Sequence, residues 1–167
     1  MKTKRTGTIY LVQSALIAAI YAAVTYAVSP LSFGAQQIRF SEAMTVLPVL
    51  TPAAVPGLAI GCVIANIGSP FGLVDIVIGT LATLLAAICT RATRNIRFKN
   101  MPLLSLIFPV LFNGVFIGLE IAYFLPEGLT FAGFLASGGG VALGEAISCY
   151  VLGLPLFAAL NKAKIFK

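Results

Sequence analysis

The sequence predicts an all-α membrane protein with six transmembrane helices, and three observations support this fold class. The first is composition: 59% of the residues are hydrophobic, 10% are charged, and the mean hydropathy is +1.03. One soluble core does not bury that much apolar surface, so lipid is the expected solvent. The others are the lengths of the apolar runs and the distribution of basic residues between them.

The basic residues predict the orientation. Ten of the eleven Lys and Arg residues fall into three clusters, which six spans would place on one side of the membrane. The clusters are Lys2, Lys4 and Arg5; Arg91, Arg94, Arg97 and Lys99; and Lys162, Lys164 and Lys167. Arg39 and the five carboxylates fall on the other side. Because Lys and Arg are enriched in cytoplasmic loops, we expect cytoplasmic N- and C-termini.

The first predicted helix covers residues 9–28. Basic residues precede it, as in a signal peptide, but it is about as long as a bilayer span of roughly 20 residues, so we interpret it as a retained helix. Residues 31–40, with Phe33 and Gly34, are predicted to form a loop over the outer ends of the helices, placed as a lid. A short second helix follows over residues 41–50, limited by Pro residues.

The remaining helices are bounded by Pro, Gly and basic residues. We expect them over residues 57–67, 73–90 and 102–124, with a last span that ends near residue 160 and has an uncertain start at the glycines 138–140. The second and third helices are too short to cross roughly 30 Å straight, so we expect them to be tilted, covered by protein or partly re-entrant. The chain, 1–167, is predicted to be a single integral membrane domain.

Four carboxylates are predicted within these helices, all in the outer half of the membrane. Glu42 opens the second helix and Asp75 opens the fourth. Glu120 lies about one turn from the end of the fifth helix, and Glu145 lies near the start of the last. Glu42 and Asp75 have an alternative interpretation as first-turn acids, which the helix dipole stabilises.

Glu120 is the strongest candidate for function, because an ionisable group in an apolar stretch is costly unless it faces protein or water. Asn113 is seven residues earlier on the same helical face, and Asn66 is placed to extend this polar stripe. The alternative is hydrogen bonding between helices, which Asn often provides in membranes. For Glu120 together with Glu145, we favour a functional cavity.

The charge balance on the outer side is acidic, which suits a cationic or donor-rich small ligand. Arg39 is three residues before Glu42, so it either forms a local ion pair or contacts a carbonyl or ring of the ligand. Several aromatic residues offer flat surfaces for stacking, although packing is the default role for each. They are Phe33, Phe40, Phe71, Tyr123 and Tyr150.

Small residues form a second pattern. Ala15, Ala19 and Ala23 repeat every four residues in the first helix, which lets another helix approach closely. Glycine pairs repeat the spacing elsewhere: Gly57 and Gly61, Gly114 and Gly118, and Gly140 and Gly144. Since we do not expect all of these to face inward in a chain this small, a docking surface for another membrane protein is predicted.

The sequence lacks the residues and motifs that several function classes require. The chain has no His, no phosphate-binding loop of the ATPase type and no metal-ligand spacing among its three cysteines, so we expect no enzyme activity, no cofactor and no metal site. The basic residues sit at the ends of apolar runs and not in an aromatic-rich stripe, so we expect no nucleic-acid partner. Uphill transport would need an ion gradient or an ATPase partner.

The combination of several segments resembles the queuosine-precursor transporter family. They are Ser32-Phe33-Gly34, Gln37-Ile38-Arg39-Phe40-Ser41-Glu42-Ala43, Gly61-Cys62, Ala65-Asn66, Ser69-Pro70-Phe71-Gly72-Leu73 with Asp75, Gly144-Glu145, Tyr150 and Leu152-Gly153-Leu154-Pro155-Leu156. The resemblance covers nearly the whole chain, and the combination is specific although no single segment is.

The resemblance implies a six-helix S component of an energy-coupling-factor (ECF) importer in the bacterial plasma membrane. Such a protein binds its ligand in an outward pocket and docks on a membrane coupling subunit that carries two ATPase subunits; Ala15, Ala19 and Ala23 would match the docking face. The implied ligand is a deazaguanine-type queuosine precursor or queuine.

The candidate residues fit this ligand, because a guanine-like edge presents adjacent N–H donors and an aminomethyl group is cationic. Glu42, Glu120 and Glu145 are the candidate acceptors, Arg39, Asn66 and Asn113 would orient the ligand, and Asp75 and Tyr150 complete the predicted site. Two alternatives stay open: an S component for riboflavin or thiamine, and a stand-alone ion-coupled carrier that uses Glu120 and Glu145.

Overall fold

The computed structural model describes residues 2–29 and 39–166, and for residues 2–6 only the backbone. Its elements, in chain order, are helix α1 (Lys2–Ala27), the 3₁₀-helix η1 (Phe40–Val49), helices α3 (Ala54–Asn66), α4 (Leu73–Ala92), α5 (Ile107–Tyr123) and α6 (Phe131–Ala146), the π-helical segment η2 (Ile147–Gly153) and helix α7 (Leu154–Ala163). The predicted all-α class is confirmed. Most of the predicted lid, including Phe33 and Gly34, lies outside the described residues.

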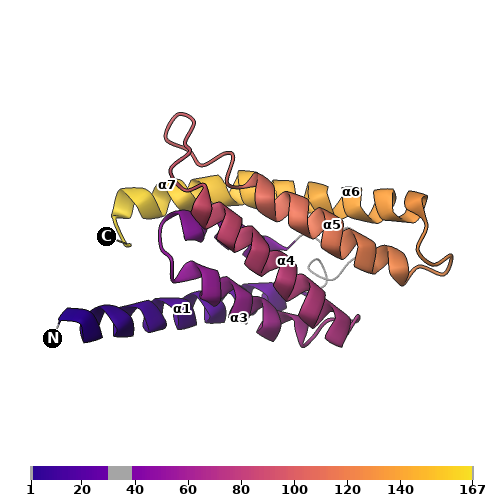
Figure 1. Cartoon of the computed structure of the whole chain (residues 1–167), viewed down its shortest axis with the longest axis horizontal. Helices are drawn as coiled ribbons and strands as arrows, with labels where there is room; N and C mark the ends of the chain where they lie inside the picture. The colour runs from indigo at the N-terminus through magenta and orange to yellow at the C-terminus, as the bar shows by residue number, and fades with distance from the viewer. Residues whose placement is uncertain (1, 30–38, 167) are drawn as a thin grey trace.

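The helices form a row that folds around η1. α1 packs against α3, α3 against α4, α4 against α5 and α5 against α6, as Figure 1 shows. η1 contacts α1, α3, α4, η2 and α7, and every residue from Ser41 to Val49 is buried. The element that carries Glu42 is therefore at the centre of the molecule.

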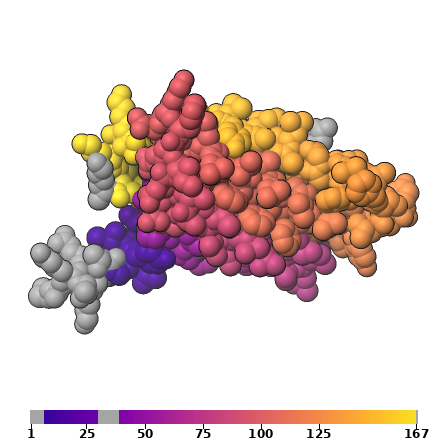
Figure 2. Space-filling model, turned by 45° about the horizontal axis from the view of Figure 1, so that its top comes forward, coloured from indigo at the N-terminus to yellow at the C-terminus, as the bar shows by residue number. Residues whose placement is uncertain are grey.

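Both ends of the chain lie at the same end of the molecule. Figure 1 shows the N- and C-termini there, together with the loop that joins α4 to α5, and Figure 2 shows this loop beside the C-terminal segment. The turns that follow α3 and α5 lie at the opposite end. The three basic clusters of the sequence therefore belong to segments that gather at one end.

Three helical segments are long and apolar enough to cross a membrane: Gly7–Ala27, Leu73–Ala92 and Phe131–Ala163. The last of these combines α6, η2 and α7 in one run of 33 residues. Three further apolar helices, η1, α3 and α5, are shorter. Length and composition thus assign a membrane protein, with three clear spans.

The 3₁₀ geometry of η1 lengthens a short segment. A 3₁₀-helix rises about 2.0 Å per residue, against 1.5 Å in an α-helix, and runs of more than a few residues are uncommon. Pro48 lacks the N–H of a regular helix, and the Thr45 hydroxyl donates to the Glu42 carbonyl at 2.6 Å. At the end of η1, Arg91 Nη1 donates to the Pro48 carbonyl at 2.9 Å and so caps the helix.

The π segment η2 precedes Pro155, the second residue of α7. Proline removes one backbone donor and its ring crowds the preceding turn, and a wider π turn relieves that conflict without ending the helix. η2 packs directly on η1, so the two irregular elements meet in the centre of the molecule.

Some predicted boundaries were wrong. α3 begins at Ala54, because Pro56 is tolerated in a first turn, and α5 begins at Ile107 and not at residue 102. The glycines 138–140 lie inside α6, which begins at Phe131. Consequently Glu145 lies next to the last residue of α6, near the middle of the 33-residue run, and not near the start of the last helix.

Small residues bring helices together within the chain. A Cβ atom on Gly57 would lie 2.8 Å from the Ser14 carbonyl oxygen, and one on Gly61 would lie 2.9 Å from Tyr21 Cβ, so α1 and α3 are in close contact. Gly118 similarly lies so close to Gly138 that a Cβ there would overlap the Gly138 Cα. These glycines face inward and are not part of a docking surface.

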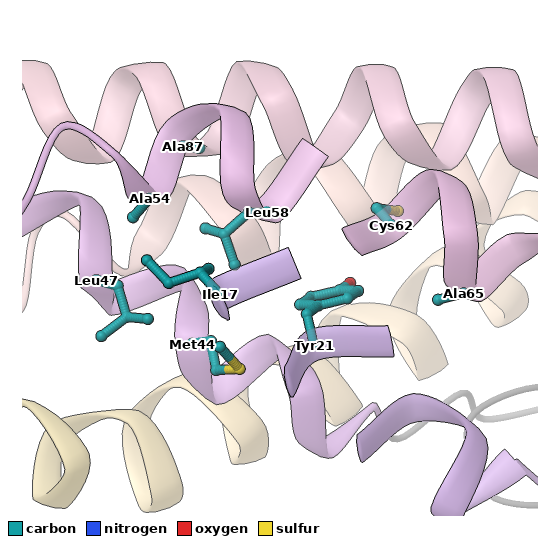
Figure 3. Packing of buried hydrophobic residues seen from close by; sticks show 9 residues of the cluster. All are labelled: Ile17, Tyr21, Met44, Leu47, Ala54, Leu58, Cys62, Ala65 and Ala87. Atoms are coloured by element: carbon teal, nitrogen blue, oxygen red, sulfur yellow. The ribbon is translucent and has the colours of Figure 1, made fainter. Parts of the chain in front are cut away.

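A buried apolar cluster holds η1 between α1 and α3. Figure 3 shows its side chains converging from these three elements and from α4. Its buried members are Ile17, Tyr21, Met44, Leu47, Ala54, Leu58, Cys62, Ala65 and Ala87. Tyr21 is fully buried and carries the polar atom that links this cluster to Glu42.

Candidate functional site

Polar side chains from five parts of the chain meet around Glu42. The Glu42 side chain is 1% exposed, and its Oε1 accepts a hydrogen bond from the Tyr21 hydroxyl of α1. One turn along α1, the Thr25 hydroxyl donates to the Ser41 hydroxyl at 2.7 Å. These contacts connect α1 to the first turn of η1, and they leave Glu42 Oε2 without a partner among the described residues.

Arg39 forms a buried ion pair with Asp75. Arg39 Nη2 lies 3.3 Å from Asp75 Oδ2, and both side chains are at most 5% exposed. Asn66 Nδ2 donates to the Asp75 carbonyl at 2.8 Å and to its Oδ1 at 3.3 Å. Gly79, one turn on, leaves room for this contact, because a Cβ there would lie 2.6 Å from Asn66 Nδ2. These contacts join the start of η1 to the end of α3 and the start of α4.

Glu145 approaches Glu42 from the other side. Cys149 Sγ lies 3.7 Å from the Glu42 carbonyl oxygen and 3.8 Å from Glu145 Oε2, so this thiol in η2 bridges the two acidic residues. Asn113 of α5 lies beside Glu145. Its amide nitrogen makes no hydrogen bond of good geometry within the described part of the chain.

Glu120 lies at the edge of this group. It is 3% exposed, yet neither carboxylate oxygen has a hydrogen-bond partner in the described structure. It also lines a cavity of about 260 Å³ between α4 and α5, together with Phe116, Tyr123 and Phe124. The Phe124 ring packs against Phe71, with centroids 5.2 Å apart. Glu120 therefore joins the polar group to an aromatic-lined space.

Unpartnered buried atoms are concentrated in this region. In the described residues they are Glu42 Oε2, Asn66 Oδ1, Thr80 Oγ1, Asn113 Nδ2, both carboxylate oxygens of Glu120, and Ser148 Oγ. A buried polar group without a hydrogen bond costs about 1–3 kcal/mol, more if charged. These unpartnered polar groups are available to water, an ion or a ligand.

The electrostatics of the site favour a donor-rich ligand. Four acidic residues, Glu42, Asp75, Glu120 and Glu145, are buried with a single guanidinium. Arg39 is within electrostatic range of the three glutamates, but its direct ion pair is with Asp75. The excess of acceptors suits a ligand with several N–H groups or a positive charge.

The structure brings together seven of the eight residues predicted for the binding site. Of the two alternatives for Arg39, the structure shows an ion pair, but its partner is Asp75, 36 residues away, and not the neighbouring Glu42. Tyr150 is not part of the group: its hydroxyl donates to the Leu103 carbonyl at 2.9 Å, in the segment before α5. Ala15, Ala19 and Ala23 are all exposed on the face of α1 turned away from the site.

Sequence reasoning missed the contribution of α1 and η2. Ser14, Tyr21 and Thr25 share one face of α1, and this polar stripe in an apolar helix was the available signal. Each finds an inward partner: Ser14 Oγ donates to the Ala53 carbonyl at 2.9 Å. Ser148 and Cys149 gave no comparable signal, because their inward direction depends on the π turn.

Comparison with known proteins gives one match. Residues 11–162, nearly the whole chain, match the family described as QueT transporter. No curated protein and no solved structure matches the chain significantly. The matched region contains every residue of the buried polar group. With its membrane-spanning helices, the chain is a membrane transporter and not an enzyme, and it belongs to the QueT transporter family.

Proposed function

We propose that this protein is the substrate-binding S component of an ECF importer in the bacterial plasma membrane. Its ligand is a deazaguanine-type queuosine precursor or queuine, taken from outside the cell. The observation that carries the proposal is the group of buried acids around Glu42 and Glu120 whose oxygens lack partners. Membership of a transporter family makes a transported solute the natural supplier of those partners.

The chemistry of the ligand matches the chemistry of the unpartnered atoms. A guanine-like ring carries an N–H and an adjacent NH₂ on one edge, and a carboxylate accepts such a pair with its two oxygens. Glu120 has both oxygens available. Asn113 Nδ2, which lies beside Glu145, is a candidate donor for a ring carbonyl, and Glu42 Oε2 is a further acceptor for an aminomethyl group.

The cavity next to Glu120 suits a flat ring. Its volume is about 260 Å³, and aromatic side chains of α5 form part of its wall. Aromatic pairs prefer offset or tilted arrangements, which leaves ring faces available for a planar ligand. In this proposal the ring lies between the aromatic side chains and the polar group, while the Arg39–Asp75 pair holds the surrounding helices.

Transport requires partners in this proposal. The chain contains no ATP-binding loop, so a membrane coupling subunit and two ATPase subunits supply the energy. Ala15, Ala19 and Ala23 form the docking face for the coupling subunit. Their exposure supports this role, because the opposite face of α1 already packs on α3.

The proposed topology has six passes, with both termini in the cytoplasm. η1, α3 and α5 provide the three shorter passes, and the 3₁₀ rise of η1 extends its reach to about 20 Å. The gathering of three basic clusters at one end supports this orientation. The buried acids then open toward the outside through the region between α3, α4 and α5.

Calorimetric titration of the purified, ligand-free protein tests the ligand class. Queuine and the aminomethyl and cyano deazaguanines are compared with riboflavin and thiamine. We expect saturable heat with at least one deazaguanine and none with the two vitamins. Binding of riboflavin or thiamine alone would reassign the substrate within the same kind of importer.

Uptake measurements separate the importer from a stand-alone carrier. Cells that express this chain without ATPase subunits are expected to accumulate no deazaguanine, because the chain has no energy source of its own. Uptake in those cells that an uncoupler abolishes would contradict the proposal and favour an ion-coupled carrier with Glu120 and Glu145 as the relay.

A further inference from the structure

A groove lies beside η1, and the buried acids Asp75, Glu120 and Glu145 are not among its lining residues. α1, η1 and α7 enclose this groove of about 460 Å³, whose walls are almost entirely apolar. Representative lining residues are Leu16, Ile20, Met44, Leu47, Leu156 and Phe166. The parts of α1 and α7 that line it belong to two of the candidate membrane spans, so the groove is at membrane depth.

A smaller polar cavity continues the groove toward the end of the molecule where the chain termini lie. It has a volume of about 180 Å³ and contains Arg97, Asn161 and Lys164. Leu160 and Phe166 line both cavities, so the two spaces are adjacent. Along α1 the groove extends from residue 13 to residue 24, which is about 16 Å at the rise of an α-helix.

Within residues 2–29 and 39–166, no carboxylate neutralises these two basic residues. In the described part of the chain the one ion pair is Arg39–Asp75, and neither Arg97 nor Lys164 contacts a carboxylate. Arg97 Nε donates to the Arg94 carbonyl at 3.3 Å, and its guanidinium carbon lies 5.3 Å from the centre of the Phe157 ring. These contacts fix the side chain and leave its terminal nitrogens available to an anion.

From this arrangement we infer a binding site for one anionic phospholipid. An acyl chain occupies the groove between α1 and α7, and the phosphate group lies at Arg97 and Lys164. Basic pockets at the cytoplasmic ends of membrane helices bind anionic head groups in this way. This site is separate from the proposed substrate site and does not depend on which solute is transported.

The groove favours a lipid over a peptide. A protein segment in an apolar groove at membrane depth must satisfy all its backbone donors and acceptors itself. An acyl chain has none to satisfy, and its volume adapts to the long, narrow space. The basic residues in the polar cavity at one end then select an anionic head group. The apolar groove alone does not distinguish between head groups.

Native mass spectrometry of the protein in an equimolar mixture of phosphatidylglycerol and phosphatidylcholine tests this inference. The wild type is expected to retain one phosphatidylglycerol in preference to phosphatidylcholine. The variant Arg97→Ala/Lys164→Ala should lower that preference roughly tenfold or more, because both basic contacts are lost. Lys99→Ala removes a charge from the same basic cluster without lining the cavity, and should keep the preference.

A second pair of variants tests the acyl-chain groove. Leu16→Trp places a large ring in the groove and should reduce retention of either lipid, whereas Leu11→Trp, on an exposed part of the same helix, should not. Circular dichroism confirms that each variant remains folded. Equal retention of the two lipids by the wild type, equal effects within either pair, or a bound peptide or second copy in place of a lipid would overturn the inference.

Discussion

The buried acidic residues differ in how far the protein itself satisfies them. Asp75 has both a cationic partner and an amide donor, from Arg39 and Asn66. Glu42 has one partnered oxygen and one free, and Glu120 has two free. Since burial of a polar group is stabilising only when it is hydrogen-bonded, these residues have different roles. Asp75 links α4 to Asn66 of α3 and to Arg39 before η1, and in the proposed function Glu120 is the acceptor left for the ligand.

The first prediction concerns this structural pair. Asp75→Asn leaves the Arg39 guanidinium buried without its ion-pair partner, and we expect the free energy of unfolding to fall by about 3 kcal/mol. The double variant Arg39→Met/Asp75→Leu removes both charges, so its free energy of unfolding should fall by less than that of the single variant. Chemical unfolding in detergent measures both. Glu127→Gln, at an exposed acid, serves as control and should change stability by no more than about 0.5 kcal/mol.

A loss of less than about 0.5 kcal/mol in Asp75→Asn would contradict this role. It would mean that the neighbouring glutamates compensate the guanidinium equally well.

For single residues, the sequence predicted which side chains belong to the candidate site better than it predicted which residues they contact. Glu120 and Asn113 were recognisable because a polar residue in an apolar membrane helix is energetically costly unless it faces protein or water. The partner of Arg39 was not predictable, since Glu42 is three residues away in sequence while Asp75 is brought near by the turn between α3 and α4. Tyr21 was overlooked because tyrosine is common at the ends of membrane helices, and its depth appears only once η1 is in place.

At the level of helices, two kinds of contact position the site. Glycines bring α1 against α3 and α5 against α6, and the irregular segments η1 and η2 meet between those pairs. The close packing fixes the outer walls, while η1 and η2 direct Glu42, Ser148 and Cys149 inward. Rigid walls around a locally irregular centre are suited to holding a small ligand.

The second prediction tests the glycine contact between α5 and α6. Gly118→Ala inserts a methyl group where the Gly138 backbone already lies, so we expect a loss of about 1–3 kcal/mol in stability. Gly139→Ala is the matched control: no atom lies within 4 Å of its Cβ position, and alanine favours a helix by up to about 1 kcal/mol. Thermal unfolding in detergent compares the two. Equal stability of the variants would show that the helices separate easily and contradict this packing.

The sequence predicted the existence of every helix but not the geometry of two of them. Pro48 was predicted to limit the second helix, and Pro155 lies within the predicted last span; a proline is compatible with a kink or a helix end, so neither residue predicts a 3₁₀ or π segment. The choice of a 3₁₀ turn in η1 depends on Arg91, which reaches it from the end of α4, and on Thr45. Arg91 and Pro48 are 43 positions apart in sequence, so local patterns do not reveal this contact.

In the whole molecule, the three basic clusters of the sequence lie in segments that gather at one end of the helical bundle. The termini and the α4–α5 loop gather at one end, and this loop carries three basic residues, Arg94, Arg97 and Lys99, around a tight turn in which Lys99 and Asn100 both have positive φ. The turns that follow α3 and α5 lie at the opposite end. In the proposed topology the basic end faces the cytoplasm, and a donor-rich solute would reach the acidic residues from the other side.

The third prediction tests this orientation. With a membrane-impermeant maleimide on intact cells, Glu127→Cys should be labelled and Asn100→Cys should not. Both positions are exposed, and the native Cys62 and Cys149 are buried; the half-buried Cys89 is replaced by serine in both variants, which keeps background labelling low. Asn100→Cys should react once the cells are permeabilised. Labelling in the reverse order would place the termini outside and contradict the proposed topology.

The central claim, that the unpartnered acids bind the transported solute, is tested most directly at Glu120. Calorimetric titration of the best deazaguanine compares the wild type with Glu120→Gln and with the matched control Glu127→Gln. We expect Glu120→Gln to lose about 1.5–3 kcal/mol of binding free energy, at least tenfold in affinity, because it removes charge-assisted hydrogen bonds. The control should bind as the wild type does. Unchanged affinity in a folded Glu120→Gln protein would contradict the account.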